Sequence, residues 1–584
     1  MKLNGRHGWI ECVFLTIAVV CASTARGEPP APRNAKDRLG TPASGQRKVI
    51  GLRDSNCLAC HGNATPKSEP ELSPDLGSRG SDGWFLGDEI LTWNLHDHHY
   101  HAFSILLNEQ SRQIAKHLGI VDQQTGESLV HRDRRCLSCH SSLPVEQMTL
   151  KDNLVQEETA SDPRYTIGVS CEACHGPAGK GANGADGWGV AHTKREFEPA
   201  HSGTWRTLSP QKKFDDYGYW DIHSTRTQTR VCLSCHLGNA EQQKVITHEM
   251  YAAGHPPLPS FELSQFIHQM PRHWRRLDEK PKELRDEFLE QTRTQRDSGS
   301  FPVEYDPKGL AVPKATMIAA LVTLEESMHL TADLLNDPAD TAQPELANYA
   351  CFGCHHELVR DGWRKTRRLT TTPGRPTLHE WPFALASIVA TSQFHDIADA
   401  PLKAEIGLVA AALNSQPYGN ATELRNATRS LATAAESQAR RLSVLTIDRQ
   451  RADDLLRGIA RFASTESVDY DSARQFIWAY ERTQSALKSP PEPWVRGQIP
   501  LKWVGGNPSL QELEESLVLW LPANRNKDGS KVELHSGNKP FNRVDHSVDV
   551  AKTLARIANY HPDIVRNAFK WLEQSPTPNG EPQK

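Results

Sequence analysis

The chain has 584 residues, with 67 Lys and Arg against 71 Asp and Glu and a formal net charge of -4. This near balance gives no electrostatic reason to expect nucleic-acid binding, which depends on concentrated positive charge. The length allows two or three domains.

The first residues have the features of a secretory signal peptide. A basic start precedes an apolar stretch from Trp9 to Val20, and small residues follow as far as Ala25. We expect residues 1–25 to be a Sec-type signal peptide, which would place the protein in the periplasm or otherwise outside the cytoplasm. The alternative is a retained N-terminal anchor, although the stretch is short for one and the mature chain is expected to lack a membrane span. Residues 26–48 are predicted to be a flexible leader.

Five copies of the pattern Cys-x-x-Cys-His are the strongest signal in the sequence. From the first to the fifth motif they are Cys57, Cys60 and His61; Cys136, Cys139 and His140; Cys171, Cys174 and His175; Cys232, Cys235 and His236; and Cys351, Cys354 and His355. Two thiols three positions apart can form thioethers with the two vinyl groups of one haem, which makes this the attachment pattern of c-type haem. The histidine that follows is then held below the ring, where it can ligate iron. The sequence therefore predicts five covalent haems c.

Two other chemistries share the cysteine spacing, namely a zinc site and a redox-active disulfide. Neither of them requires a histidine directly after the second cysteine. The chain has 12 cysteines, and those outside the motifs are Cys12 and Cys21, which lie in the predicted signal peptide. Covalent haem is therefore the favoured interpretation of all five motifs.

The motifs divide the chain into two predicted parts, and the predicted fold class is mainly α. Residues 49–375 are expected to be an irregular multihaem cytochrome c region whose core is filled by haem, with helices near Lys282–Arg296 and Ala315–Leu335. Residues 376–584 contain no cysteine, and their apolar residues recur at helical spacing. They are predicted to form a separable α-helical C-terminal domain.

The remaining histidines determine which haems gain a second protein ligand. The candidates are His96, His98, His99 and His101 in one cluster, His192 after the third motif, and His248 and His255 in THEMYAAGHPPL. If Thr247 caps a helix there, His248 and His255 would share one face about 10 Å apart and could serve two neighbouring irons. The alternative for each histidine is an ordinary surface or loop position.

The segments GVSCEACHGPAG, VCLSCHLGN and THEMYAAGHPPL resemble the cytochrome c-554 family of multihaem cytochromes. WNLHDHHYHAFSILL resembles that family's Trp-to-His segment, which implies His99 as a distal ligand, and the segment after the third motif implies His192. The resemblance covers about residues 50 to 265. It implies periplasmic electron transfer by haems that are mostly ligated by two histidines and packed in close pairs.

The fifth motif departs from this family, whose prototype has four haems. CFGCHHEL, followed by Trp363, resembles an extension in larger exported relatives. No matching motif supplies a distal ligand here, and the candidates are His329, His356 and His379. We expect a six-coordinate haem; the alternative is an open site that binds a small ligand.

Three functions are compatible with this pattern. The favoured one is electron transfer between redox partner proteins, because all five motifs end in histidine and no catalytic residue is indicated. The second is an oxidoreductase that acts on nitrite, hydroxylamine or nitric oxide as small-molecule substrate at one open haem. The third is a haem-bearing sensor or scaffold whose C-terminal domain binds a partner. Arginines near the motifs, among them Arg226 and Arg230, are candidates for pairing with haem propionates or for an ordinary solvated face.

Overall fold

The computed structural model describes residues 47–54, 57–62, 84–157, 161–192, 204–297, 309–335, 345–355, 375–391, 401–488 and 560–574. These residues are mainly helical, which confirms the predicted fold class. Their strands are β1 (Leu150–Lys151) and β2 (Leu154–Val155), which pair antiparallel. The predicted signal peptide and nearly all of the predicted leader lie outside the described residues.

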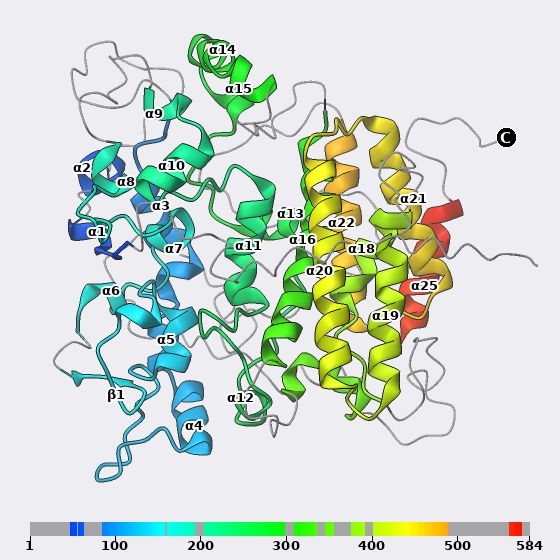
Figure 1. The fold of residues 1–584 in the computed structure, drawn as a ribbon, viewed down its shortest axis with the longest axis horizontal. Coiled ribbons are helices and arrows are strands. Elements are labelled where there is room, and N and C mark those ends of the chain that lie inside the picture. The colour runs from blue at the N-terminus through cyan, green and yellow to red at the C-terminus, as the bar shows by residue number, and fades with distance from the viewer. Residues whose placement is uncertain are drawn as a thin grey trace, which may run out of the picture.

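Short helices joined by irregular segments make up one side of the molecule (Figure 1). They are α1 (Gly51–Asp54), α2 (Leu58–His61), α3 (Glu89–His96), η2 (His98–His101), η3 (Ser104–Leu107), α4 (Glu109–Leu118), α5 (Arg134–His140), η4 (Val145–Gln147), α6 (Pro163–Thr166), α7 (Cys171–His175), α8 (Trp188–Ala191), α9 (Thr204–Thr207), α10 (Pro210–Tyr217), α11 (Thr225–His236), α12 (His248–Ala252), α13 (Leu263–Gln269), η8 (Leu277–Glu279), α14 (Lys282–Gln291) and α15 (Arg293–Asp297). The helix predicted near Lys282–Arg296 is thus two helices that meet at Thr292. We call this side, residues 47–297, the motif region.

Long helices that run roughly side by side form the other side (Figure 1). They are α16 (Ala311–Leu334), α18 (Trp381–Thr391), α19 (Pro401–Ser415), α20 (Ala421–Ser443), α21 (Arg449–Thr465), α22 (Tyr470–Leu487) and α25 (Pro562–Gln574). The short turns η9 (Leu346–Asn348) and η10 (Cys351–Gly353) lie between α16 and α18 in the chain. We call the long helices the helical bundle.

Capping residues and apolar residues at helical spacing explain why the helices of the bundle form and pack. Asn420 caps α20 by accepting a hydrogen bond from the Glu423 backbone N–H at 3.0 Å, and Leu424 and Leu431 lie on the buried face of that helix. α16 is buried along most of its length, because α11, α18, α20 and α22 pack around it. One hydrophobic core therefore joins α16 to helices on the far side of the predicted boundary at residue 376.

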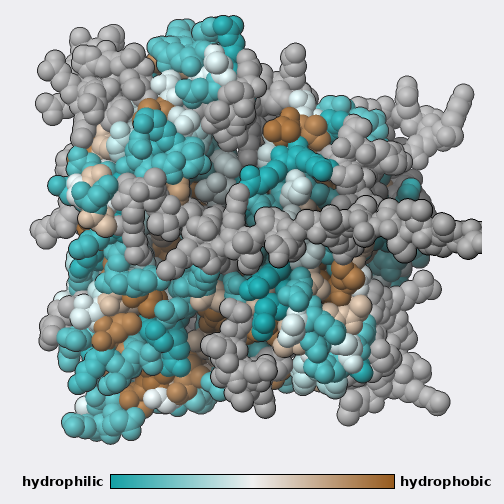
Figure 2. All heavy atoms as spheres, viewed as in Figure 1, coloured by the Kyte–Doolittle hydropathy of each residue, from teal (hydrophilic) through white to brown (hydrophobic). Residues whose placement is uncertain are grey.

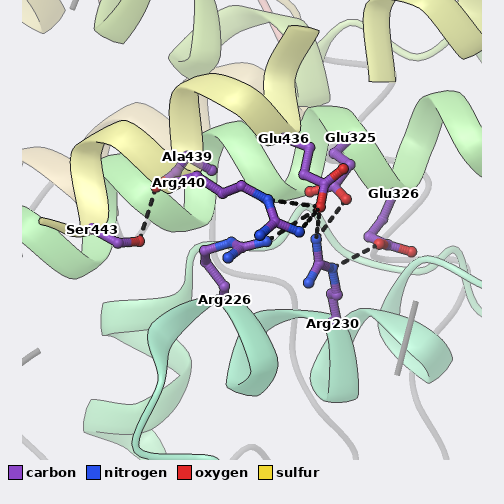
Figure 3. A network of polar contacts seen from close by, with 8 residues as sticks. All are labelled: Arg226, Arg230, Glu325, Glu326, Glu436, Ala439, Arg440 and Ser443. Atoms are coloured by element: carbon purple, nitrogen blue, oxygen red, sulfur yellow. Dashed lines mark hydrogen bonds and ion pairs between the residues drawn. The ribbon is translucent and has the colours of Figure 1, made fainter. Parts of the chain in front are cut away.

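Ion pairs between partly buried arginines and glutamates connect the motif region to the bundle (Figure 3). Arg230 on α11 donates to Glu325 at 2.6 Å and to Glu326 at 3.2 Å, both on α16. Arg226, one turn earlier, pairs with Glu436 on α20 at 3.4 Å. These two arginines, which the sequence offers as propionate partners, bind carboxylates of the bundle instead. The fourth motif, at the end of α11, is thereby fixed against α16 and α20.

The visible surface carries mostly hydrophilic side chains with scattered apolar patches (Figure 2). Within the described ranges, no helix combines the length and the apolar character that crossing a bilayer requires.

Candidate haem-binding sites

Four of the five motifs end a helix. The motif histidines His61, His140, His175 and His236 are the last residues of α2, α5, α7 and α11. Residues three positions apart in a helix lie on the same face, so the two cysteines of the second, third and fourth motifs lie on one face and the histidine follows at the end of the turn. The fifth motif differs, because Cys351 begins the short turn η10 and the motif is exposed at Cys351, Cys354 and His355.

Several motif and candidate distal histidines have Nδ1 held by a neighbouring oxygen. The contacts are His61 with Glu89 Oε2 (3.0 Å), His140 with Ala102 O (2.7 Å), His99 with Asp97 Oδ1 (2.8 Å), His192 with Trp188 O (2.6 Å) and His255 with Pro256 O (2.8 Å). Metal-ligating histidines typically donate their second ring nitrogen to a carbonyl or carboxylate in this way, which leaves Nε2 for the metal. This donor set fits haem iron.

Two motif histidines each face a candidate distal histidine. The ring centres of His236 and His99 are 6.2 Å apart, and those of His355 and His248 are also 6.2 Å apart. Two metal–imidazole bonds of about 2.0–2.1 Å each, with about 1 Å from each ring centre to its nitrogen, would place the ring centres about 6 Å apart. Both gaps therefore have the width that one iron between two imidazoles requires.

Two further motif histidines lie near candidate distal histidines: His140 lies near His255, and His61 lies near His192. Burial, with a contribution from nearby His140, lowers the pKa of His255 to about 4. Burial likewise lowers the pKa of His192, with a contribution from nearby His61. Low pKa values keep these imidazoles neutral at physiological pH, which is the form that binds a metal.

The cysteines show which motifs are neighbours. The charge of Cys57 contributes to raising the pKa of Cys171, so the first motif lies beside the third. Cys174 acts in the same way on Cys232, so the third motif lies beside the fourth. The second and fourth motifs meet where the thiols of Cys139 and Cys235 share a hydrogen bond.

Burial disfavours the charged form of several motif cysteines, whereas the hydrogen bond with Cys139 lowers the pKa of Cys235. Burial raises the pKa values of Cys136, Cys171 and Cys174 to about 12, so none of these thiols readily ionises. A reactive or zinc-binding cysteine needs a stabilised thiolate. A thioether sulfur carries no charge and is compatible with such burial.

The structure brings a further histidine, His273, close to a motif histidine, and the sequence alone did not indicate it. The pKa of His175 is lowered to about 3, first by burial and then by nearby His273. His273 lies outside the three clusters, in the irregular segment after Pro271, so only its position in space marks it. For the third motif, the ring in stacking contact with His175 is that of Tyr219, at 5.7 Å between ring centres.

One segment of the chain matches a known protein family. Residues 88–176, which hold the second and third motifs, match the family described as cytochrome c554 and c-prime. This segment is cytochrome c-554-like. The match supports a c-type cytochrome that carries electrons and binds haem covalently. The matched segment is shorter than the stretch from about residue 50 to 265 over which the sequence resembles this family. No curated protein and no solved structure matches the chain.

Proposed function

We propose that the protein is an exported electron carrier with five covalently bound haems c, and that a second histidine supplements the motif histidine at each of at least four. The two facing imidazole pairs, each with 6.2 Å between ring centres, are the observation that carries this proposal. Bound haem supplies one-electron oxidation and reduction at iron. The cysteines would attach the five haems, and the paired imidazoles would ligate the irons of at least four of them.

In this proposal each distal histidine serves one motif. His192 serves the first motif, His255 the second, His99 the fourth and His248 the fifth. The neighbour relations of the cysteines give the order first, third, fourth and second along the molecule. Redox partner proteins would dock where a haem edge reaches the surface, and the exposed fifth motif is the best such place.

The second candidate function is an oxidoreductase that acts on nitrite, hydroxylamine or nitric oxide. It requires one iron with an open axial position. The third motif is the best place for such an iron, because the ring stacked on His175 is that of Tyr219, although His273 also lies nearby.

The mature protein should carry the mass of a chain that begins at Arg26, after loss of residues 1–25, plus five haems. Intact mass spectrometry and pyridine haemochrome spectra measure this on protein exported by a host with the bacterial haem-attachment machinery. N-terminal sequencing locates the cleavage, which we expect after Ala25. Colourless, zinc-bearing protein would contradict the proposal, and an intact Met1 on membrane-bound protein would contradict the export part of it.

Replacement of Asp97 by asparagine should raise the midpoint potential of one haem by about 60 mV, the shift that corresponds to a tenfold change in a one-electron equilibrium. The Asp97 carboxylate is buried and bonded to His99 Nδ1 at 2.8 Å. It makes the imidazole a stronger electron donor and so stabilises ferric iron. Redox titration measures the shift. Glu109→Gln, which alters an exposed ion pair with Arg112, is the matched control and should leave all potentials unchanged. Equal shifts in both variants would refute this role of Asp97.

A further inference from the structure

The fifth motif has a histidine opposite it that neither the motif pattern nor the family match assigns. The rings of His248 and His355 are 6.2 Å apart at their centres and are inclined by only 22°. Of the histidines near this motif in the sequence, His379 is engaged elsewhere, since its Nε2 bonds the Ala347 carbonyl oxygen at 2.8 Å. A ligand needs that nitrogen free. His356 lies outside the described residues.

Glu345 holds the His248 segment against the segment that leads to the fifth motif. Its Oε1 accepts from the backbone N–H of His248 at 2.7 Å and from that of Ala347 at 2.9 Å. Thr247 caps α12 by accepting from the Met250 N–H at 3.3 Å. One carboxylate oxygen therefore links the start of α12 to η9, which precedes Cys351 by a few residues. This arrangement fixes the position of His248 relative to the fifth motif.

We propose that His248 is the second axial ligand of the haem held by Cys351, Cys354 and His355, and that this haem extends the electron path beyond the second haem. The inference rests on the proposed function, because it needs a haem at the fifth motif. His255 follows α12 and lies near His140 of the second motif. One short segment would thus supply distal ligands to two haems and join the exposed fifth motif to the half-buried second motif.

The ring orientations distinguish this haem from the fourth. His248 and His355 are nearly parallel at 22°, whereas His99 and His236 are nearly perpendicular at 88°. Parallel imidazoles interact with the same iron d orbital and separate it in energy from its partner. Perpendicular imidazoles act on both orbitals equally and leave them close in energy. The fifth haem should therefore give an ordinary rhombic low-spin paramagnetic resonance signal, and the fourth a strongly anisotropic one.

The test is electron paramagnetic resonance of the oxidised, haem-loaded full chain and its His248→Ala variant. We expect the variant to keep five haems by mass, to lose one rhombic low-spin signal and to gain one high-spin signal. Added imidazole should restore the low-spin signal by filling the vacated position. His379→Ala is the matched control and should retain every low-spin signal. His99→Ala should lose the strongly anisotropic signal and spare the rhombic one.

Retention of all low-spin signals in His248→Ala, or their loss in His379→Ala, would overturn the ligand assignment while leaving the haem count intact. A wild-type protein with four haems would instead refute the proposed function. If His248→Ala fails to fold, His248→Met tests the same ligand assignment. Methionine should give one haem with a thioether ligand and a raised potential, and unchanged potentials in that variant would overturn the assignment.

Discussion

Replacement of Arg230 by alanine should destabilise the protein by about 3–5 kcal/mol, the cost typical of removing one partner from a buried ion pair. The Arg230 side chain is only 11% exposed and contacts both Glu325 and Glu326 on α16. Without the guanidinium, two carboxylates would remain buried beside each other without their cation. Chemical unfolding followed by far-UV circular dichroism measures the change.

The pH dependence of this variant gives a second test. Burial raises the pKa of Glu325 to about 7 even with Arg230 present. Because the folded state holds this proton more tightly than the unfolded state does, the contribution of Glu325 to stability falls as pH rises from about 4.5 to about 7. Loss of Arg230 removes the nearest cation. The decrease in the free energy of unfolding of Arg230→Ala, relative to the wild type, should therefore be larger at pH 8 than at pH 5.

The matched control for Arg230 lies on the bundle surface. Arg457 pairs with Asp454 on α21, and its side chain is 47% exposed. Arg457→Ala should change stability by less than about 1 kcal/mol, as is usual for an exposed pair. Equal losses in the two variants would mean that the contacts between α11 and α16 do not stabilise the protein in the way described.

Replacement of Cys171 and Cys174 by alanine should remove the third haem and interrupt the electron path. The third motif lies between the first, through Cys57, and the fourth, through Cys232. We expect four haems by mass and a slow phase in reduction by a small donor, because the first haem loses its neighbour. Stopped-flow spectroscopy measures the phases.

The first motif provides the comparison for this variant. Cys57→Ala with Cys60→Ala also leaves four haems, but it removes a haem at the end of the path and should add no slow phase. Identical kinetics in the two double variants would contradict the order of the haems along the molecule.

The sequence was most informative where chemistry is local. A Cys-x-x-Cys-His motif occupies five consecutive residues, so the five motifs and the mainly helical character could be predicted without the structure. The helix from Ala315 to Leu335 was also predicted close to its observed bounds of Ala311–Leu334. Its place in the core was not, because α16 packs on α18, α20 and α22, which follow it by more than 45 residues in the chain.

Distal ligands are harder to predict because they depend on long-range packing. His248 faces His355 across a gap that only the fold creates, and Glu345 controls its position through backbone contacts that carry no sequence pattern. Arg230 is similar. Its place beside the fourth motif suggests a propionate partner, yet its two glutamates come from α16.

Electron paramagnetic resonance of the oxidised wild-type protein, with spin quantified against haem content, tests the central claim most directly. Electron transfer through histidine-paired haems predicts that at least four irons are low-spin, among them a strongly anisotropic fourth and a rhombic fifth, and that none of these four binds cyanide rapidly. High-spin signals of two or more irons per chain, removed by rapid cyanide binding, would contradict this account.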